Sequence, residues 1–269
     1  MNSEINFNIK DVIAIARKAG AILMQFYNTR NIKISTKEDN SIVTNVDLLS
    51  NDFLEHALLN LDSDILFFSE ENIDKSSKIA IDADQLYWLV DPLDGTFDFV
   101  SNRKDFSVSI ALMKNNSPLL GVIYVPCTDS CYYAQKNCGA FKQHAETIKP
   151  IVNKPKKVGE YITFAISPRD NFSFYSKYLS DSIKYKIICY GSCSIKCCAI
   201  FDNVADIYMS GRNTMVWDTS AAHCIASESG AGIFQLDLTA LTYNFPKVCV
   251  NPKIIVTRLE FSELMKLIR

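Results

Sequence analysis

An apolar run that ends in two aspartates is the feature that most constrains this chain. Tyr87 to Val90 is rich in aromatic and β-branched residues and is followed by Asp91-Pro92-Leu93-Asp94-Gly95-Thr96. The run predicts a buried strand, and because Pro92 cannot donate to a ladder, we expect both carboxylates to project where the sheet ends. Carboxylates suit Mg²⁺, Gly95 lets the backbone approach a phosphate, and a helix that begins near Thr96 directs free N–H groups at the anion. The same residues form ordinary surface turns, so this stretch alone leaves both interpretations open.

Two other segments place acids in a similar setting. Phe67-Phe68-Ser69-Glu70-Glu71 is a second apolar run that ends in carboxylates, and Val216 to Ala222 puts Asp218 at the expected start of an Ala-rich helix. Asp218 alone could be a plain helix N-cap. Together, four separated acids predict a site for a divalent cation.

In these motifs the chain resembles the lithium-sensitive, Mg²⁺-dependent phosphatase superfamily, which includes inositol monophosphatases, fructose-1,6-bisphosphatases and 3'(2'),5'-bisphosphate nucleotidases. Residues 91–96 match its Asp-Pro-Leu-Asp-Gly-Thr motif, and Trp217 to Ala221 match its Trp-Asp-x-x-Ala motif. Further segments that fall in family order are Lys37, Val43 to Asp47, Ser69 to Glu71, Gly121 to Pro126, Gly139 to Phe141 and Gly191-Ser192. The resemblance covers roughly residues 10 to 257.

Composition narrows the class of protein. The 269 residues allow one large domain or two lobes, and 28 basic against 30 acidic residues give a net charge of −2, so no basic field points to nucleic acid. No apolar run has the length of a membrane span, and the segment 1–10 lacks the pattern of a secretion signal, so we expect a cytoplasmic protein. The nine scattered cysteines favour reduced, buried thiols. Cys189, Cys193 and Cys197 are spaced as on one helical face, but zinc is disfavoured because no Cys-x-x-Cys or paired His accompanies them.

The order of elements predicts two lobes. In the first, residues 1–150, we expect helices at 9–27 and from Thr44 or Asn45 to about 61, then strands at 65–68, 87–90, 106–113, 119–125 and 131–134. This is an α+β pattern. Pro150 to Gly159 has the composition of a linker. In the second lobe, residues 151–269, strands at 161–166, 186–189 and 206–209 alternate with helices at 172–183, 193–204 and 218–229, which is an α/β pattern. The resemblance implies a layered α-β-α-β-α sandwich of the sugar-phosphatase type.

The resemblance also implies a role for each site residue, with two or three Mg²⁺ ions in all. One ion is held by Glu70, Asp91 and the Leu93 carbonyl. A second is held by Asp91, Asp94 and Asp218. Glu70 and Thr96 position the attacking water, Asp47 and Thr44 form a hydrogen-bonded pair beside it, and Gly95, Thr96 and Asp218 contact the phosphorylated substrate.

Several of these residues have an ordinary alternative. The alternative for Asp47 is an ordinary acid at a helix start, where it interacts with the macrodipole. Lys37 is either a solvated lysine or a residue near the site. His56, His144 and His223 are few and dispersed, which argues for no triad without excluding a Ser/His hydrolase.

Other details favour the bisphosphate nucleotidase branch. They are Tyr87 to Val90, Ser107 to Leu112, Gly191 to Lys196 and Asn213 to Thr219. In that branch the segment around Ser192 and Lys196 contacts the nucleotide, and Lys196 would meet a second phosphate as a compact charge, or else be an exposed helix lysine. The chain departs from the branch at three places. An expected arginine is missing from residues 210–214, and whether Arg212 replaces it is left open by the sequence. Phe97 replaces a lysine, and Leu238 replaces a turn glycine.

The sequence therefore predicts Mg²⁺-dependent removal of the 3'-phosphate from adenosine 3',5'-bisphosphate, giving AMP and phosphate. The alternative enzyme is an inositol monophosphatase. The non-enzyme alternative is a catalytically silent regulatory or RNA-associated relative, which would have lost a metal carboxylate, and none is lost. We expect a small phosphorylated substrate and no nucleic-acid partner, and a homodimer is compatible with the sequence.

Overall fold

The computed structural model describes residues 7–37, 41–73, 81–157, 161–181 and 184–269. Its helices are α1 (Ile9–Thr29), α2 (Asn45–Leu59), α3 (Thr96–Val100), α4 (Ser173–Ser176), α5 (Cys193–Phe201), α6 (Val216–Ser229) and α7 (Phe261–Leu267), with a 3-10 turn at Pro126–Thr128. One sheet contains, in spatial order, β3 (Leu66–Ser69), β4 (Leu86–Asp94), β5 (Ser107–Lys114), β6 (Ser117–Val125), β7 (Ser130–Gln135), β8 (Ala140–His144) and β9 (Thr147–Pro150). A second contains β11 (Lys184–Cys189), β10 (Tyr161–Ile166), β12 (Ile207–Met209), β14 (Ile254–Thr257) and β13 (Gly232–Gln235). The strands β1 (Ile34–Thr36) and β2 (Ile42–Thr44) form a separate antiparallel pair.

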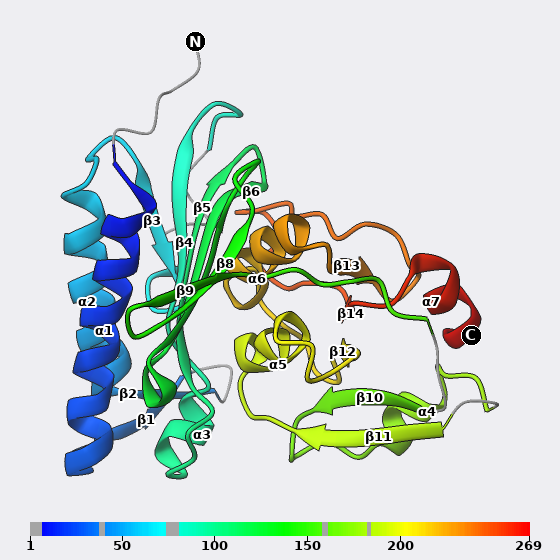
Figure 1. Cartoon of the computed structure of the whole chain (residues 1–269). Coiled ribbons are helices and arrows are strands. Elements are labelled where there is room, and N and C mark those ends of the chain that lie inside the picture. The colour runs from blue at the N-terminus through cyan, green and yellow to red at the C-terminus, as the bar shows by residue number, and fades with distance from the viewer. Residues whose placement is uncertain (1–6, 38–40, 74–80, 158–160, 182–183) are drawn as a thin grey trace.

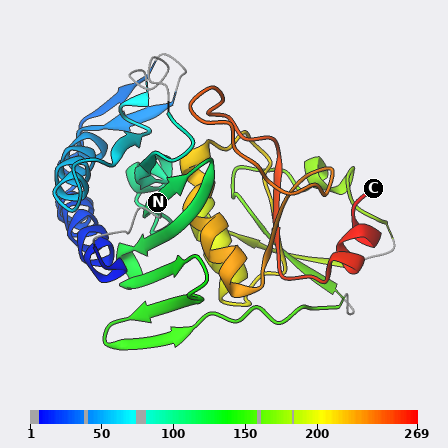
Figure 2. The same ribbon diagram turned by 90° about the horizontal axis from the view of Figure 1, so that it is seen from above.

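These elements stack in five layers (Figures 1 and 2). Helices α1 and α2 cover one face of the seven-stranded sheet, and α5 and α6 lie between its other face and the five-stranded sheet. The outer face of the five-stranded sheet packs against α4 and α7. The predicted α-β-α-β-α sandwich is confirmed. One apolar core joins α5 and α6 to both sheets, so residues on either side of position 150 share it.

Strand β4 shows why the layers form around the aspartate motif. Tyr87 and Leu89 point into the core that contains α5 and α6, whereas Trp88 and Val90 point into the core beneath α1 and α2. The alternation of side chains along a strand produces this division, and a run without polar residues can therefore be buried on both faces. Continuing the alternation directs Asp91 toward α5 and α6.

The structure corrects the expected end of this strand. Instead of stopping at Val90, β4 continues to Asp94, with Asp91 paired to Ser109 and Asp94 paired to Ser107 of β5. The register shifts between the two aspartates, so two residues of β4, including Pro92, oppose one residue of β5. A bulge needs no ladder hydrogen bond from the proline, and it tilts the strand locally. The carboxylates therefore lie within the strand end rather than beyond it.

The helix expected at 172–183 was also wrong, because α4 spans only Ser173–Ser176. Downstream, Ser180 N donates to the Leu267 carbonyl and Leu179 bridges to Ile268, so this backbone pairs with the C-terminal segment. Residues 182 and 183 lie outside the described residues. The sequence pattern missed β1, β2, β8, β9, β13, β14 and α7, while the remaining predicted helices and strands are present with shifted ends.

The segment predicted as a linker is packed, as far as it is described. Ile151 and Asn153 are buried, and the Asn153 amide donates to the Ile200 carbonyl at the end of α5. Residues 158 and 159 lie outside the described part. The division into lobes at residue 150 stays a prediction.

All nine cysteines are described, and each is a free thiol. Cys189 ends β11, so it does not share a helical face with Cys193 and Cys197 of α5. Within the described ranges, we find no helix that combines the length and the apolar character needed to cross a membrane.

Candidate active site

Four acids from separate segments meet at the end of β4, on the side that faces α5 and α6. Glu70 follows β3, Asp91 and Asp94 belong to β4, and Asp218 lies in the first turn of α6. Burial raises the pKa of Asp91 well above its usual range, and the nearby charges of the other three acids raise it further. Burial followed by the charge of Asp94 does the same to the pKa of Asp218. The fold therefore brings together the four carboxylates that the sequence predicted would converge.

Their hydrogen bonds show how each is held. Asp91 is 2% exposed, and its Oδ1 accepts from the backbone N of Leu93 at 3.0 Å. Asp218 Oδ2 accepts from the backbone N of Met215 at 2.8 Å, which fixes the start of α6. Each carboxylate has oxygen lone pairs beyond those used by this bond. Both are therefore positioned by the backbone while retaining ligand capacity.

Asp94 is held more completely, at the N-terminus of α5. Its Oδ2 accepts from the Ser192 hydroxyl at 2.6 Å and from the Ser194 backbone N at 2.7 Å, while its Oδ1 lies 3.3 Å from the Cys193 backbone N. Free N–H groups and the helix macrodipole stabilise an anion at this position. Asp94 thus fastens α5 to the aspartate motif.

A chain of hydrogen bonds links α2 to α3 beside these acids. Thr44 caps α2, its hydroxyl lies 2.5 Å from Asp47 Oδ2, and its backbone N donates to the same oxygen at 2.8 Å. Thr96 Oγ1 lies 3.0 Å from Asp47 Oδ1 and 3.1 Å from the Leu93 carbonyl oxygen. Burial raises the pKa of Asp47, although the bonds from Thr44 and Thr96 oppose this. Asp47 therefore acts both as a helix-start acid and as the partner of Thr96.

Lys37 reaches the site and pairs with both glutamates. Its ammonium lies 2.9 Å from Glu70 Oε1 and 2.8 Å from Glu71 Oε1. Burial opposes the charged form, but the two carboxylates outweigh it and raise the pKa of Lys37. Burial raises the pKa of Glu71 to about 7 even so. The structure thus places Lys37 beside a predicted metal ligand rather than in solvent.

The donor set fits Mg²⁺ in chemistry. Hard carboxylate oxygens crowd a buried space, and like charges in such proximity call for a cation. Across the described ranges, however, no group of three or more Asp, Glu, His or Cys side chains is already arranged to hold a metal ion. Glu70 is turned toward Lys37, and Asp94 toward α5. Both side chains are thus oriented by protein partners, and any ion would share their remaining lone pairs with these partners or displace them.

A cavity of about 180 Å³ opens next to the acids, lined by Asp94, Gly95 and Asp218 together with α5 and the segments after β10 and β12. Gly95 has φ +98°, and a Cβ there would lie 2.6 Å from the Asp105 carbonyl oxygen, so no larger residue fits. Ser192 and Lys196 line the same cavity, but Lys196 is only 5% exposed and its ammonium contacts the carbonyls of Gly191 and Ser192. The structure brings all the predicted site residues to one region, and their roles stay predictions.

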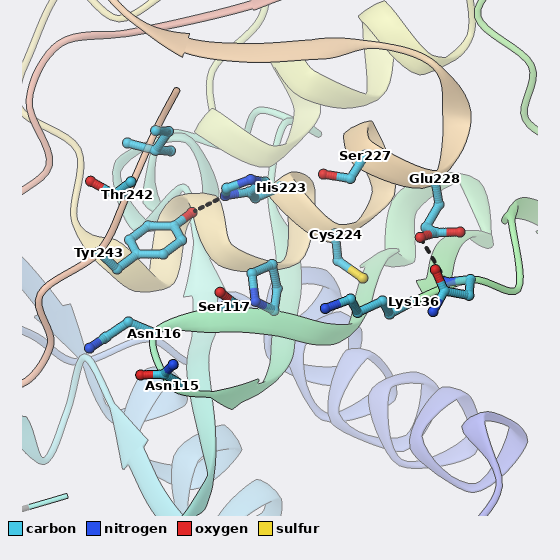
Figure 3. Close-up of a pocket in the computed structure, with 13 residues that line it drawn as sticks. Asn115, Asn116, Ser117, Lys136, His223, Cys224, Ser227, Glu228, Thr242 and Tyr243 are labelled. Carbon is cyan, nitrogen blue, oxygen red and sulfur yellow. Dashed lines mark hydrogen bonds between the residues drawn. The ribbon is translucent and has the colours of Figure 1, made fainter. Parts of the chain in front are cut away.

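A larger cavity of about 560 Å³ lies beside the C-terminal half of α6 (Figure 3). Its side chains bond to one another: His223 Nδ1 lies 3.2 Å from the Tyr243 hydroxyl, and both Glu228 oxygens accept from the backbone of the β7–β8 turn at 2.9 Å. Burial lowers the pKa of His223 to about 4. Within the described part of the chain, no His ring bonds to a serine hydroxyl, so a Ser/His pair has no support.

Sequence reasoning missed several polar residues around the site. Ser107 and Ser194 contact Asp94, and Asp98 lines the cavity with Arg103 and Arg169 beside it. Of the residues that contact Asp94, only the predicted Ser192 had a local sequence signal, because serine is a preferred N-cap residue. The others are brought in by long-range packing.

Comparison with known proteins gives a consistent result. The chain matches the family model of the inositol monophosphatase family over residues 8–268. It is 34% identical over 251 residues to the 3'(2'),5'-bisphosphate nucleotidase CysQ of Aggregatibacter actinomycetemcomitans, covering 92% of this chain and 91% of that protein. The crystal structure of CysQ from Bacteroides thetaiotaomicron, a bacterial member of the inositol monophosphatase family, matches with a TM-score of 0.74 and 26% identity, covering 96% of this chain and 100% of that one. An IMPase/NADP phosphatase complexed with Mg²⁺ and phosphate shares the fold, with a TM-score of 0.74 at 18% identity over 93% of this chain and 89% of that one.

The fold and the cluster of acids are those of a phosphatase. The chain belongs to the inositol monophosphatase family.

Proposed function

We propose that this phosphatase is a Mg²⁺-dependent enzyme that removes the 3'-phosphate from adenosine 3',5'-bisphosphate, with AMP and phosphate as products. The observation that carries the proposal is the group of four carboxylates, Glu70, Asp91, Asp94 and Asp218, of which Asp91 and Asp94 are buried. Their charges disturb one another's ionisation. The choice of substrate is supported by the likeness to CysQ nucleotidases over more than nine-tenths of the chain.

Two or three Mg²⁺ ions are the expected cofactors. The residues that would hold them are the four acids and the carbonyl of Leu93, with Asp91 shared between two ions. When bound, Mg²⁺ supplies a Lewis acid that activates water and stabilises charge on the phosphate oxygens. Because Glu70 contacts Lys37 and Asp94 contacts α5, ion binding competes with these two internal partners.

Thr96 is placed to orient the attacking water. Its single hydroxyl proton has two acceptors within reach, Asp47 Oδ1 and the Leu93 carbonyl, so its lone pairs remain available to accept a hydrogen bond from a water molecule. Thr44 holds Asp47 through the capping box. Glu70 is the carboxylate on the same side that can take up the water's proton, and Gly95 and Thr96 offer backbone N–H groups to the phosphate.

Glu70→Gln and Thr96→Val test this positioning. Both should lower kcat more than they raise KM, because the lost interaction operates on the attacking water rather than on the bound substrate. Steady-state phosphate release measures both constants. If only KM changed in both variants, the water-positioning role would be wrong.

A phosphate-release panel tests the substrate. Adenosine 3',5'-bisphosphate, inositol 1-phosphate and fructose 1,6-bisphosphate are compared at saturating Mg²⁺, and we expect the highest kcat/KM for the first. A preference for inositol 1-phosphate would assign the alternative activity. Absence of turnover on every substrate, with a folded protein, would favour the catalytically silent relative. Light scattering on the same sample tests whether the chain forms a homodimer.

A further inference from the structure

The cavity beside the acids is lined by two arginines that no predicted role uses. Arg169 follows β10 and Arg212 follows β12, and both line the cavity that also contains Asp94, Gly95 and Asp218. Two cations on the wall of a phosphatase cavity require an explanation, because the expected metal site would by itself bind the phosphate of a substrate that has only one.

Arg169 is held in place by an aromatic ring. Its guanidinium carbon lies 4.2 Å from the centre of the Phe97 ring, in the first turn of α3. Phe97 is 40% exposed at a position next to the aspartate motif, so part of its ring faces solvent. A guanidinium stacked on a ring keeps its planar N–H donors free at the edge.

Those donors form one long ion pair and no hydrogen bond with the described residues. The nearest acid is Asp98, whose Oδ2 lies 3.9 Å from an Arg169 nitrogen, beyond hydrogen-bond distance, and Asp98 is already paired with Arg103 at 2.9 Å. No hydrogen bond to the Arg169 guanidinium is made by the described residues. With its side chain 35% exposed, Arg169 is restrained in position yet free to bond a ligand.

A second cation stands close to the first. Burial lowers the pKa of Arg169, and the charge of Arg212 is among the causes, so the two guanidiniums repel each other. Arg212 has one loose partner, Asp170 at 3.5 Å, and its side chain is 62% exposed. An anion between the two arginines would relieve this repulsion, and planar guanidinium groups match the oxygens of a phosphate.

Lys196 is less suited to that contact. It is buried, and its ammonium is engaged by two backbone carbonyls beneath the cavity. Its charge contributes to the local potential, but a direct bond to substrate would require it to leave these carbonyls.

We propose that Arg169, stacked on Phe97 and assisted by Arg212, binds the second phosphate of the substrate and so selects bisphosphorylated nucleotides over monophosphates. This inference rests on the proposed function and assigns its specificity to residues outside the metal site.

The experiment compares two substrates that differ only at the 5' position, adenosine 3',5'-bisphosphate and 3'-AMP, at saturating Mg²⁺. Arg169→Met removes the charge and keeps the length of the side chain, while Arg169→Lys keeps the charge and loses the planar fork. Loss of a charge-assisted contact predicts that Arg169→Met lowers kcat/KM on the bisphosphate about ten- to a hundredfold, mainly through KM. The loss on 3'-AMP should stay within about twofold, and Arg169→Lys should fall between the two.

Direct binding provides a second measurement. Titration calorimetry without Mg²⁺ should show weaker binding of 5'-AMP, which carries only the second phosphate, to Arg169→Met than to wild type. Lys177→Met is the matched control, since Lys177 also lies on aromatic rings, those of Phe174 and Tyr178, but does not line the cavity. It should behave as wild type in both measurements.

The outcomes separate the two proposals. If wild type prefers the bisphosphate and Arg169→Met, melting like wild type, keeps that preference, the arginine has no selective role. If Arg169→Met loses equally on both substrates, it affects the site in general, and the proposal is also overturned. If wild type shows no preference for the bisphosphate, the proposed substrate is wrong and the arginine's role falls with it.

Discussion

The two ends of α6 carry polar groups in opposite conditions. At its N-terminal end, Asp218 faces other buried carboxylates, and their charges disfavour one another. At its C-terminal half, His223 and Glu228 each bond to a partner from a neighbouring segment (Figure 3). The cavity at this second end is about three times larger, 560 against 180 Å³, yet His223 and Glu228 on its wall both have hydrogen-bond partners. In this molecule, mutually repelling charge rather than cavity size distinguishes the proposed active site from the other cavity.

Substitutions at the two ends of α6 should therefore have opposite effects on stability and on activity. Removing a charge from the N-terminal end abolishes activity while relieving repulsion. Removing a polar group from the C-terminal end destabilises the fold and leaves activity unchanged.

The largest effect is expected for Asp91→Asn. The substitution keeps the shape of the side chain and removes a charge from both expected metal positions, so phosphate release should fall by about a thousandfold or more. Asp84→Asn is the control, because the Asp84 side chain is 96% exposed just before β4. Asp84→Asn should retain wild-type turnover. Near wild-type turnover of soluble Asp91→Asn would refute the metal assignment.

The second effect concerns acid stability at the other end of α6. His223 has a pKa of about 4 in the folded state because it is buried, against about 6.5 when unfolded. Between these values the unfolded state binds the proton and the folded state does not, so the free energy of unfolding falls as the pH drops from about 6.5 to about 4, by up to about 3 kcal/mol. Urea unfolding at several pH values should show this loss in wild type and a smaller loss in His223→Gln. His144→Gln, at an exposed position, is the control, and equal pH profiles for wild type and His223→Gln would contradict the account.

A smaller effect is expected for Glu228→Gln. The carboxylate accepts from Asn137 N and Gly139 N, and a glutamine keeps one acceptor oxygen, so we expect a loss of about 1 kcal/mol in the free energy of unfolding. Turnover should remain within about twofold of wild type, because the residue lies away from the acids. A large loss of turnover without a loss of stability would show that this end of α6 also serves catalysis.

Much of the active site was predictable because its chemistry is local in sequence. The aspartate motif, the capping pair Thr44 and Asp47, and the helix start at Asp218 each have a pattern that short-range physics explains. Leu238, noted as the replacement of a turn glycine, indeed has φ +67°. The bulge in β4 was not predictable, since the register shift exists only in the pairing with β5, a separate segment of the chain.

The contact of Arg169 with Phe97 at the cavity depends on packing between distant segments. Arg169 meets Phe97 only because the segment after β10 folds against α3, and no periodicity reports that contact. The strands β8, β9 and β13 were missed for a related reason. Residues of β8 and β13 are mostly half-buried and those of β9 are exposed, so these strands lack the clear alternation that marks a core strand.

The central claim is that the four carboxylates repel one another until Mg²⁺ binds, and thermal unfolding with and without Mg²⁺ tests it most directly. Without Mg²⁺, Asp91→Asn should melt at a higher temperature than wild type, because one of the repelling charges is gone. Added Mg²⁺ should raise the wild-type midpoint in a concentration-dependent manner and leave that of Asp91→Asn nearly unchanged. Equal shifts in both proteins, or no shift in wild type, would contradict the claim.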